Sequence, residues 1–108
     1  MTSDQADASG ALIPSCRLDP NGLRSQRDRY RALGEQAVRV ARKPGRLAVG
    51  FNPNVDERLL AEAIAVERRC CPFFELSYDT GARELTISVN DPSDEAALSA
   101  LHKTLTSR

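Results

Sequence analysis

The sequence predicts an α+β domain of order αββαββα, with four strands in one antiparallel sheet and the helices on one face of it. Two segments alternate apolar and polar residues on either side of a short turn, which is typical of β-hairpins. Three other segments repeat apolar residues every three or four positions, which is typical of amphipathic helices. Because each hairpin lies between two of these helices, an antiparallel sheet covered on one face is the simplest arrangement.

The first helix is expected over about residues 20–36. Asp19 supplies an N-cap and Pro20 fits the first helical turn, where its missing N–H is not needed. A hairpin follows, with strands near 37–42 and 46–52 joined by a Lys-Pro-Gly turn. Proline and glycine suit the two central positions of such a turn, so the direction reversal is well specified.

The second helix is expected over about residues 55–70. Asn54 and Glu57 have the spacing of a capping box, in which each side chain satisfies a backbone N–H at the helix start. Pro72 must end the helix, because proline cannot continue the hydrogen-bond ladder. A broad apolar stripe between these limits predicts that one face of the helix is buried.

A second hairpin is expected from strands near 74–79 and 84–90, again with one buried face. Asp91 and Pro92 then repeat the cap and proline signal that begins the first helix. The third helix places three leucines on one face: Leu98, Leu101 and Leu105. Alternation in strands and the 3.6-residue period in helices direct these side chains to one core: Leu47, Val49, Phe51, Leu60, Ile64, Leu76, Leu85, Ile87, Val89, Leu98 and Leu101.

The chain has 108 residues, which fits a single domain. Residues 1–14 are small and polar without a period, so we expect a mobile N-terminal tail before one α+β domain over residues 15–108. No apolar run spans a bilayer and no secretory signal is recognisable, so we expect a cytoplasmic protein that does not bind membranes. Three cysteines, an odd number, fit a reducing compartment where no disulfide framework forms.

The net charge is zero, but the charges are unevenly distributed along the chain. Residues 17–46 carry nine basic and three acidic side chains, whereas residues 47–108 carry six and ten. Few aromatic residues are present and none interleaves with the arginines, as a base-stacking surface would require. The basic third is therefore interpreted as a solvated helix face and hairpin edge, and nucleic acid is not an expected partner.

The most informative chemistry lies at the end of the second helix, where Cys70 and Cys71 are adjacent. Glu67 lies three and four residues earlier, so carboxylate and thiols share one end of the helix. Zinc sites favour two residues between cysteines, whereas Hg(II), Cu(I) or As(III) prefers thiolates and accepts two or three ligands. We therefore predict a soft-metal site at Cys70 and Cys71, with Cys16 as a third ligand and Glu67 as a weak or outer-shell ligand.

Two other interpretations of the cysteine pair stay open. Both residues can serve as small apolar side chains between the helix end and the sheet. They can also act in redox chemistry, either as a vicinal disulfide or with Cys16 as the resolving thiol.

His102 is the single histidine and lies beside the leucines of the last helix, so a half-buried structural role is expected. No catalytic constellation is recognisable, which favours binding over enzymatic activity.

The strings Ser15-Cys16-Arg17-Leu18 and Cys70-Cys71-Pro72-Phe73, the second preceded by Glu67, carry a family resemblance. Over the span from Cys16 through Leu105 the chain resembles a group of small, mostly uncharacterised bacterial proteins associated with heavy-metal, particularly mercury, resistance. This resemblance implies a role in handling a thiophilic metal.

A second and more remote resemblance covers about residues 20–106. The order αββαββα is similar to that of pterin-4a-carbinolamine dehydratase, whose His-His-Pro string follows its middle helix where Cys70-Cys71-Pro72 stands here. The resemblance implies the same fold, a pocket at the end of the second helix and a homo-oligomer. Because thiols replace the paired imidazoles and Ser88-Val89-Asn90 lacks a histidine, the dehydratase reaction itself is not expected.

Together these observations predict a small cytoplasmic thiol protein that binds or buffers a soft metal ion (mercury, copper or arsenic) through its Cys-Cys-Pro motif. A dehydratase-like enzyme of altered chemistry is one alternative. A non-catalytic oligomerisation or regulatory module is another. A large apolar pocket would favour the enzyme, and three sulfurs around one point would favour the metal.

Overall fold

The structure is a computed structural model that describes residues 19–106. Its element order, α-β-β-α-β-β-α with one short 3₁₀ turn before the last helix, confirms the predicted α+β class. The predicted tail over residues 1–14 and Cys16 lie outside the described residues. The elements are α2 (Pro20–Gly34), β1 (Ala37–Lys43), β2 (Arg46–Phe51), α3 (Glu57–Cys70), β3 (Glu75–Asp79), β4 (Glu84–Ser88), η1 (Pro92–Asp94) and α4 (Glu95–Thr106).

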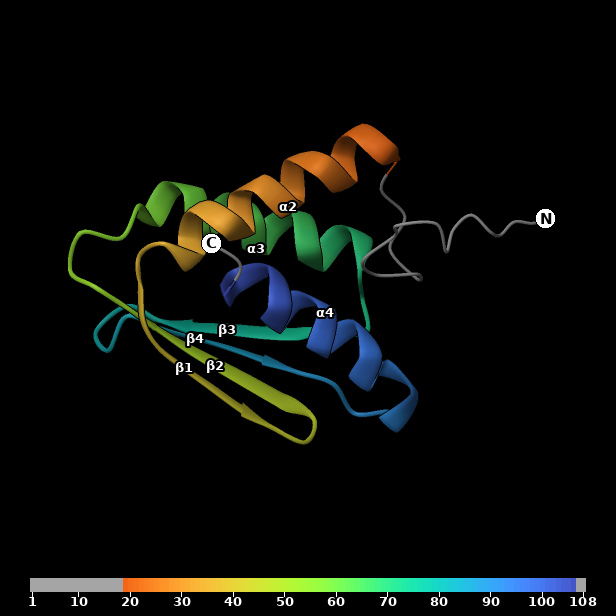
Figure 1. Cartoon of the computed structure of the whole chain (residues 1–108). Coiled ribbons are helices and arrows are strands. Elements are labelled where there is room, and N and C mark those ends of the chain that lie inside the picture. The colour runs from red at the N-terminus through yellow and green to blue at the C-terminus, as the bar shows by residue number, and fades with distance from the viewer. Residues whose placement is uncertain (1–18, 107–108) are drawn as a thin grey trace.

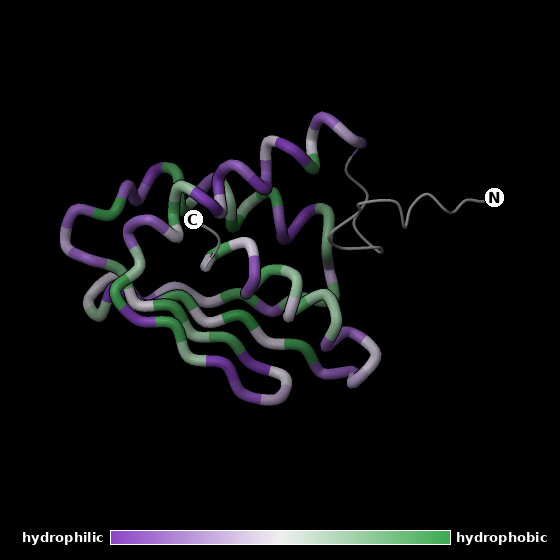
Figure 2. The backbone as a smooth tube through the Cα atoms, viewed as in Figure 1, coloured by the Kyte–Doolittle hydropathy of each residue, from purple (hydrophilic) through white to green (hydrophobic). Residues whose placement is uncertain are grey.

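The four strands form one antiparallel sheet in the order β1-β2-β4-β3, so β1 and β3 are its two edges. Leu47 of β2 lies opposite Ile87 of β4, which in turn lies opposite Leu76 of β3. All three side chains are buried, and they form one row of the apolar face. Figure 2 shows the alternation of hydrophobic and hydrophilic residues along the strands that produces this face.

All three helices lie on one side of the sheet, with α2 farthest from it (Figure 1). α3 contacts β3 and α4 contacts β2, while α2 packs against both α3 and α4. The predicted core is confirmed except at Ile64, which is only partly buried. The largest fully buried apolar side chains come from all three helices and from β2 and β4: Leu33, Leu47, Leu60, Leu85, Ile87, Leu98, Leu101 and Leu105.

The helix starts are partly as predicted. The Asp19 side chain accepts a hydrogen bond of 2.7 Å from the Gly22 N–H, which confirms the first cap. The predicted Asn54 and Glu57 capping box is wrong, because Asp56 is the N-cap of α3 and accepts from the Leu59 N–H at 3.1 Å. The chain still turns at Asn54, so α3 begins two residues later than expected.

The start of the last helix also differs in detail from the expectation. Asp91 accepts a hydrogen bond from the Ser93 N–H at 2.9 Å, as a cap should. However, the residues that follow form the 3₁₀ turn η1 before the α-helix begins at Glu95. Tighter turns of this kind are common at helix N-termini.

Within residues 19–106, no helix has both the length and the apolar character needed to cross a membrane.

Candidate functional site

The cysteine pair lies where α3 ends. Cys70 is the last residue of the helix, and Cys71 is the C-cap, whose N–H donates to the Glu67 carbonyl at 2.7 Å. Cys71 has left helical geometry, with φ −131° and ψ 73°, because Pro72 follows it and disfavours a helical residue at that point. The two adjacent side chains therefore leave the backbone from different conformations.

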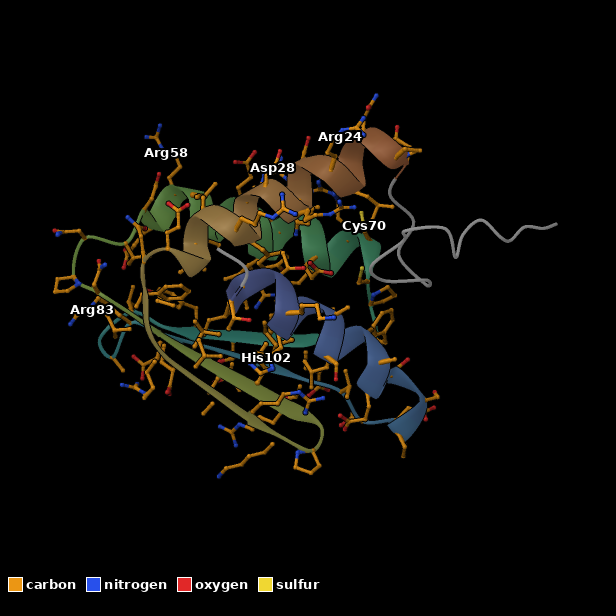
Figure 3. The ribbon with its side chains drawn as sticks, in the orientation of Figure 1. Arg24, Asp28, Arg58, Cys70, Arg83 and His102 are labelled. Atoms are coloured by element: carbon orange, nitrogen blue, oxygen red, sulfur yellow. The ribbon has the colours of Figure 1, made fainter. Side chains whose placement is uncertain are left out.

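The two cysteines differ in exposure. Cys71 is completely buried and belongs to the hydrophobic core. Cys70 is partly buried and packs against that core from outside (Figure 3). One sulfur therefore lies in the interior and the next one in the chain lies near the surface.

A buried carboxylate lies one turn before the cysteines. The Glu67 side chain is on the face of α3 that packs against α2, and the residue is only 1% exposed. Its Oε1 accepts hydrogen bonds from the Tyr30 hydroxyl at 2.6 Å and from the Gln26 Nε2 at 3.0 Å. Both donors come from α2, so the carboxylate joins the two helices.

Gln26 is held in place by its own hydrogen bonds. Its Nε2 also donates to the Ala63 carbonyl of α3 at 2.9 Å, and its Oε1 accepts from the Arg29 Nη1 at 2.8 Å. Gln26 is 4% exposed, and it faces α3 together with the phenol of Tyr30. Gln26, Tyr30, Glu67 and Cys71 therefore form a buried polar cluster between α2 and the end of α3.

The electrostatics tie Tyr30 to this cluster. Burial raises the pKa of Tyr30 well above its ordinary value, and the negative charge of Glu67 and its hydrogen bond to the phenol add to the shift. A charge on Cys71 would raise the pKa of Tyr30 further. The thiol of Cys71 thus lies within electrostatic reach of the phenol that binds the carboxylate.

The second carboxylate oxygen of Glu67 is not satisfied. Oε2 is buried and accepts no hydrogen bond within the part of the chain that the structure describes. A buried acceptor without a donor costs about 1 to 3 kcal/mol, and more when it carries charge. Oε2 therefore keeps the capacity to accept one further hydrogen bond.

The structure brings some of the predicted site residues together. Glu67, Cys70 and Cys71 share the end of α3, as expected. Cys16 lies outside the described residues. Among residues 19–106 there is no group of three or more His, Cys, Asp or Glu side chains arranged to hold a metal ion. His102 is half-buried on α4, away from the labelled Cys70 (Figure 3).

Gln26 and Tyr30 were not identified as site residues from the sequence. Their spacing in the sequence could have indicated a shared site, because residues four positions apart lie on the same face of a helix. A buried glutamine on an apolar helix face requires a polar partner on the element it packs against. The sequence does not show which element that is.

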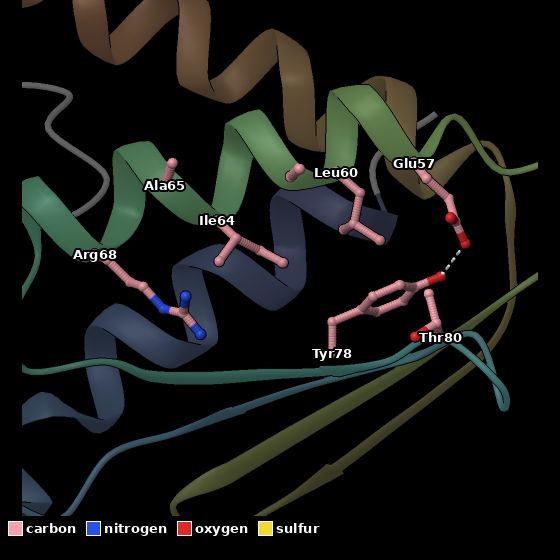
Figure 4. A pocket seen from close by; sticks show the side chains of 8 residues that line it. Glu57, Leu60, Ile64, Ala65, Arg68, Tyr78 and Thr80 are labelled. Atoms are coloured by element: carbon pink, nitrogen blue, oxygen red, sulfur yellow. Dashed lines mark hydrogen bonds between the residues drawn. The ribbon is translucent and has the colours of Figure 1, made fainter.

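A separate groove of about 340 Å³ lies between α3 and the edge strand β3 (Figure 4). The Tyr78 hydroxyl donates to Glu57 at 3.0 Å at one end of it. Arg68 lines the other end and donates from Nη2 to the Leu76 carbonyl at 2.8 Å. The cysteines and Glu67 do not line this groove. Its residues are Glu57, Leu60, Ala61, Ile64, Ala65, Arg68, Tyr78 and Thr80.

No protein-family model, curated protein or solved structure matches this chain. The predicted order of helices and strands is confirmed by the structure itself. The resemblances to the heavy-metal resistance group and to the dehydratase stay predictions.

Proposed function

We propose that this protein binds a soft metal ion through Cys70 and Cys71, with Cys16 as the third thiol. The observation that carries the proposal is the site at the end of α3. There a fully buried thiol follows a partly buried one, one helical turn after a buried carboxylate whose Oε2 has no hydrogen-bond donor among the described residues. Thiolates are the ligands that Hg(II), Cu(I) and As(III) prefer, and a cysteine pair suits ions of low coordination number.

The different exposure of the two sulfurs suits capture of an ion from solution. Cys70 is accessible, so an ion would meet this thiol first. Cys71 lies in the apolar core, where water cannot compete for the ion once both sulfurs bind it. Arg68 and Arg69 adjoin Cys70 in sequence, and positive charge near a thiol favours the thiolate, whereas Glu67 and the C-terminal end of α3 oppose it.

Glu67 has a supporting role in this proposal. A thiol loses its proton when it binds a metal, so a nearby base helps the reaction. The unsatisfied Oε2 of Glu67 is a suitable acceptor, and Tyr30 and Gln26 hold the carboxylate in place through Oε1. In the reducing cytoplasm, where we place the protein, the thiols would stay available for metal.

Native mass spectrometry of the reduced full-length chain tests the proposal. Titration with Hg(II), Cu(I), As(III) and Zn(II) should give one equivalent of a soft ion, with Zn(II) bound more weakly. Cys70→Ser or Cys71→Ser should weaken binding at least about tenfold, because a hydroxyl is a poor ligand for such ions. The variant Cys16→Ser distinguishes two-coordinate from three-coordinate binding.

His102→Ala is the matched control, since His102 lies on another helix and should leave metal affinity unchanged. Circular dichroism of the double variant Cys70→Ser with Cys71→Ala separates loss of binding from unfolding. If that folded double variant still took up a soft ion as tightly as the parent, the pair would have only a packing role.

A further inference from the structure

The two edges of the sheet carry opposite charges. On β3, Leu76 and Tyr78 point toward the helices, so Glu75 and Asp79 project from the other face. On β1, Arg42 reaches α4 on the helix side through its ion pair with Glu95, at 2.7 Å. The alternate residues Arg39 and Lys43 therefore lie on the same open face as the acidic pair.

The backbone hydrogen bonds show which groups of β3 remain open. The Phe51 N–H donates to the Arg83 carbonyl, and the Val89 N–H donates to the Gly45 carbonyl. By the two-residue period, odd-numbered residues of β4 bond to β2 and even-numbered ones bond to β3. Residues 76 and 78 of β3 therefore direct their N–H and C=O groups away from the sheet, as the Arg68 contact to the Leu76 carbonyl confirms.

The same reasoning applies to β1. Even-numbered residues of β2 bond to β1, and their partners in register are odd-numbered. Val40 and Arg42 therefore direct their backbone groups outward at this edge. Val38, on the same strand, is 65% exposed. Among residues 19–106 it is the only large apolar residue that is exposed. Both edges thus direct backbone groups outward, and on β3 the Leu76 carbonyl already accepts one hydrogen bond from Arg68.

Pairing of like edges is unfavourable. Two β3 strands would bring only acidic charged side chains together, because Glu75 and Asp79 are the charged residues of that strand. Two β1 strands would bring together only basic ones, from Arg39, Arg42 and Lys43. Like charges that face each other across strands are destabilising. The charges therefore favour β1 against β3.

We propose that β1 of one copy of this protein pairs antiparallel with β3 of another, so that the sheet continues from copy to copy. With Val40 opposite Tyr78, the outward backbone groups of both strands meet. The Leu76 carbonyl, which already accepts from Arg68, has a second lone pair for the Arg42 N–H. This register also places Arg39 opposite Asp79 and Lys43 opposite Glu75. Arg39 already has an ion pair with Glu84 of its own sheet at 3.3 Å, so Asp79 would join that pair, whereas Lys43 and Glu75 would form a new one. A shift by two residues in either direction loses both of these charge pairs.

The strand directions allow this pairing without inverting a copy. Because neighbouring strands alternate in the order β1-β2-β4-β3, β1 and β3 run in opposite directions. Two copies in the same orientation therefore present antiparallel edges, with their helices on the same side. Arg42 keeps its ion pair with Glu95, so its charge is compensated where it comes opposite Leu76.

The groove beside β3 adjoins the position that the incoming strand would take. The side chains of Leu60, Ile64 and Tyr78 line it. An added strand would direct Val40 toward the helix side, over these apolar side chains. The arrangement is head-to-tail, so each dimer still exposes one edge of each kind and further copies can add.

Analytical ultracentrifugation of the full-length chain tests the proposal. In reductant, so that disulfides do not contribute, the weight-average mass should rise above 11.8 kDa from micromolar to millimolar protein. The rise should diminish between about 50 and about 500 mM NaCl, because salt screens exposed charge pairs. A mass that stays at one chain throughout would overturn the proposal.

Charge exchange identifies the surfaces. The variant Glu75→Lys with Asp79→Lys makes both edges basic, and Arg39→Glu with Lys43→Glu makes both edges acidic. Each variant alone should associate at least about tenfold more weakly than the parent, whereas an equimolar mixture should regain association. Recovery in the mixture also shows that both variants are folded.

Arg24→Glu with Arg58→Glu is the matched control, because it changes the net charge as much as the acidic variant does, at exposed positions on α2 and α3 (Figure 3). It should associate like the parent. If both edge variants associated as strongly as the parent, or if their mixture gained nothing over either alone, the β1 to β3 pairing would be wrong.

Discussion

Helix α2 packs against two neighbouring helices in different ways. Against α4 the contact is close and steric, since a Cβ on Gly34 would lie 1.9 Å from the Leu105 carbonyl oxygen. Against α3 the contact is polar, because Gln26 and Tyr30 of α2 bind Glu67. Helix α2 thus has one interface defined by shape, with α4, and one defined by hydrogen bonds, with α3.

The comparison separates stability from function. The α2 to α4 contact leaves no space and needs no polar partner, so it serves packing. The α2 to α3 contact buries a carboxylate with one oxygen unsatisfied in the described residues, which costs stability. An apolar pair would hold the helices together at lower cost. We therefore interpret the polar contact as part of the proposed metal site.

Gly34→Ala should have the largest effect. Alanine is favoured over glycine in helices, but here its methyl group would collide with backbone, so the two helices must separate. We expect a loss of about 3 kcal/mol in the free energy of unfolding, measured by urea denaturation. Gly81→Ala, in an exposed turn, is the control and should change stability little. Equal effects would contradict the steric account.

Tyr30→Phe should have the next largest effect. It removes the 2.6 Å hydrogen bond to Glu67 and leaves Gln26 as the donor to Oε1. Because hydrogen bonds to charged groups are strong, we expect a loss of about 2 kcal/mol in the same denaturation experiment. Tyr78→Phe removes a hydrogen bond to Glu57 at a more exposed position and should cost less. A reversed order would mean that the buried cluster contributes little.

Alkaline pH should weaken the polar interface. Burial and Glu67 raise the pKa of Tyr30 well above 10, so above that pH the unfolded chain releases the phenol proton before the folded chain does. Stability is then complete below about pH 10 and falls as pH rises, by at most about 1.4 kcal/mol per pH unit from one proton. The slope should be smaller in Tyr30→Phe. If stability fell with pH as steeply in Tyr30→Phe as in the parent, Tyr30 would not be the cause of the loss.

Glu67→Gln should have the smallest effect on stability. The amide keeps an oxygen for Tyr30 and Gln26 and removes the charge, so the free energy of unfolding should change by no more than about 1 kcal/mol in either direction. Soft-metal affinity should fall more clearly, because the nearby base is lost. If stability fell by several kcal/mol while metal binding was unchanged, Glu67 would be a structural residue.

Much of the fold follows from local sequence signals. Alternation and the Lys-Pro-Gly turn define the first hairpin, and the observed strands end within one residue of the prediction. The second cap was mispredicted because two residues with capping side chains, Asn54 and Asp56, lie close together. Local propensity does not choose between such neighbours, whereas the path of the chain into α3 does.

The candidate site divides in the same way. The proximity of Glu67, Cys70 and Cys71 follows from helical spacing and from Pro72, which ends α3. The exposure of each cysteine does not, because it depends on how the end of α3 packs on the core. The hydrogen bonds from Tyr30 and Gln26 to Glu67 span 37 and 41 positions of the chain, respectively. No local sequence pattern identifies these partners.

The sequence by itself determined the elements, the apolar faces and the place of the thiols, since each depends on residues a few positions apart. The tertiary structure alone decided the strand order β1-β2-β4-β3, which places a basic strand and an acidic strand at opposite edges. It also decided that Glu67 is buried against α2, with no donor to its Oε2 among residues 19–106. Both features arise from contacts between distant segments, which form only when the chain packs around a common core.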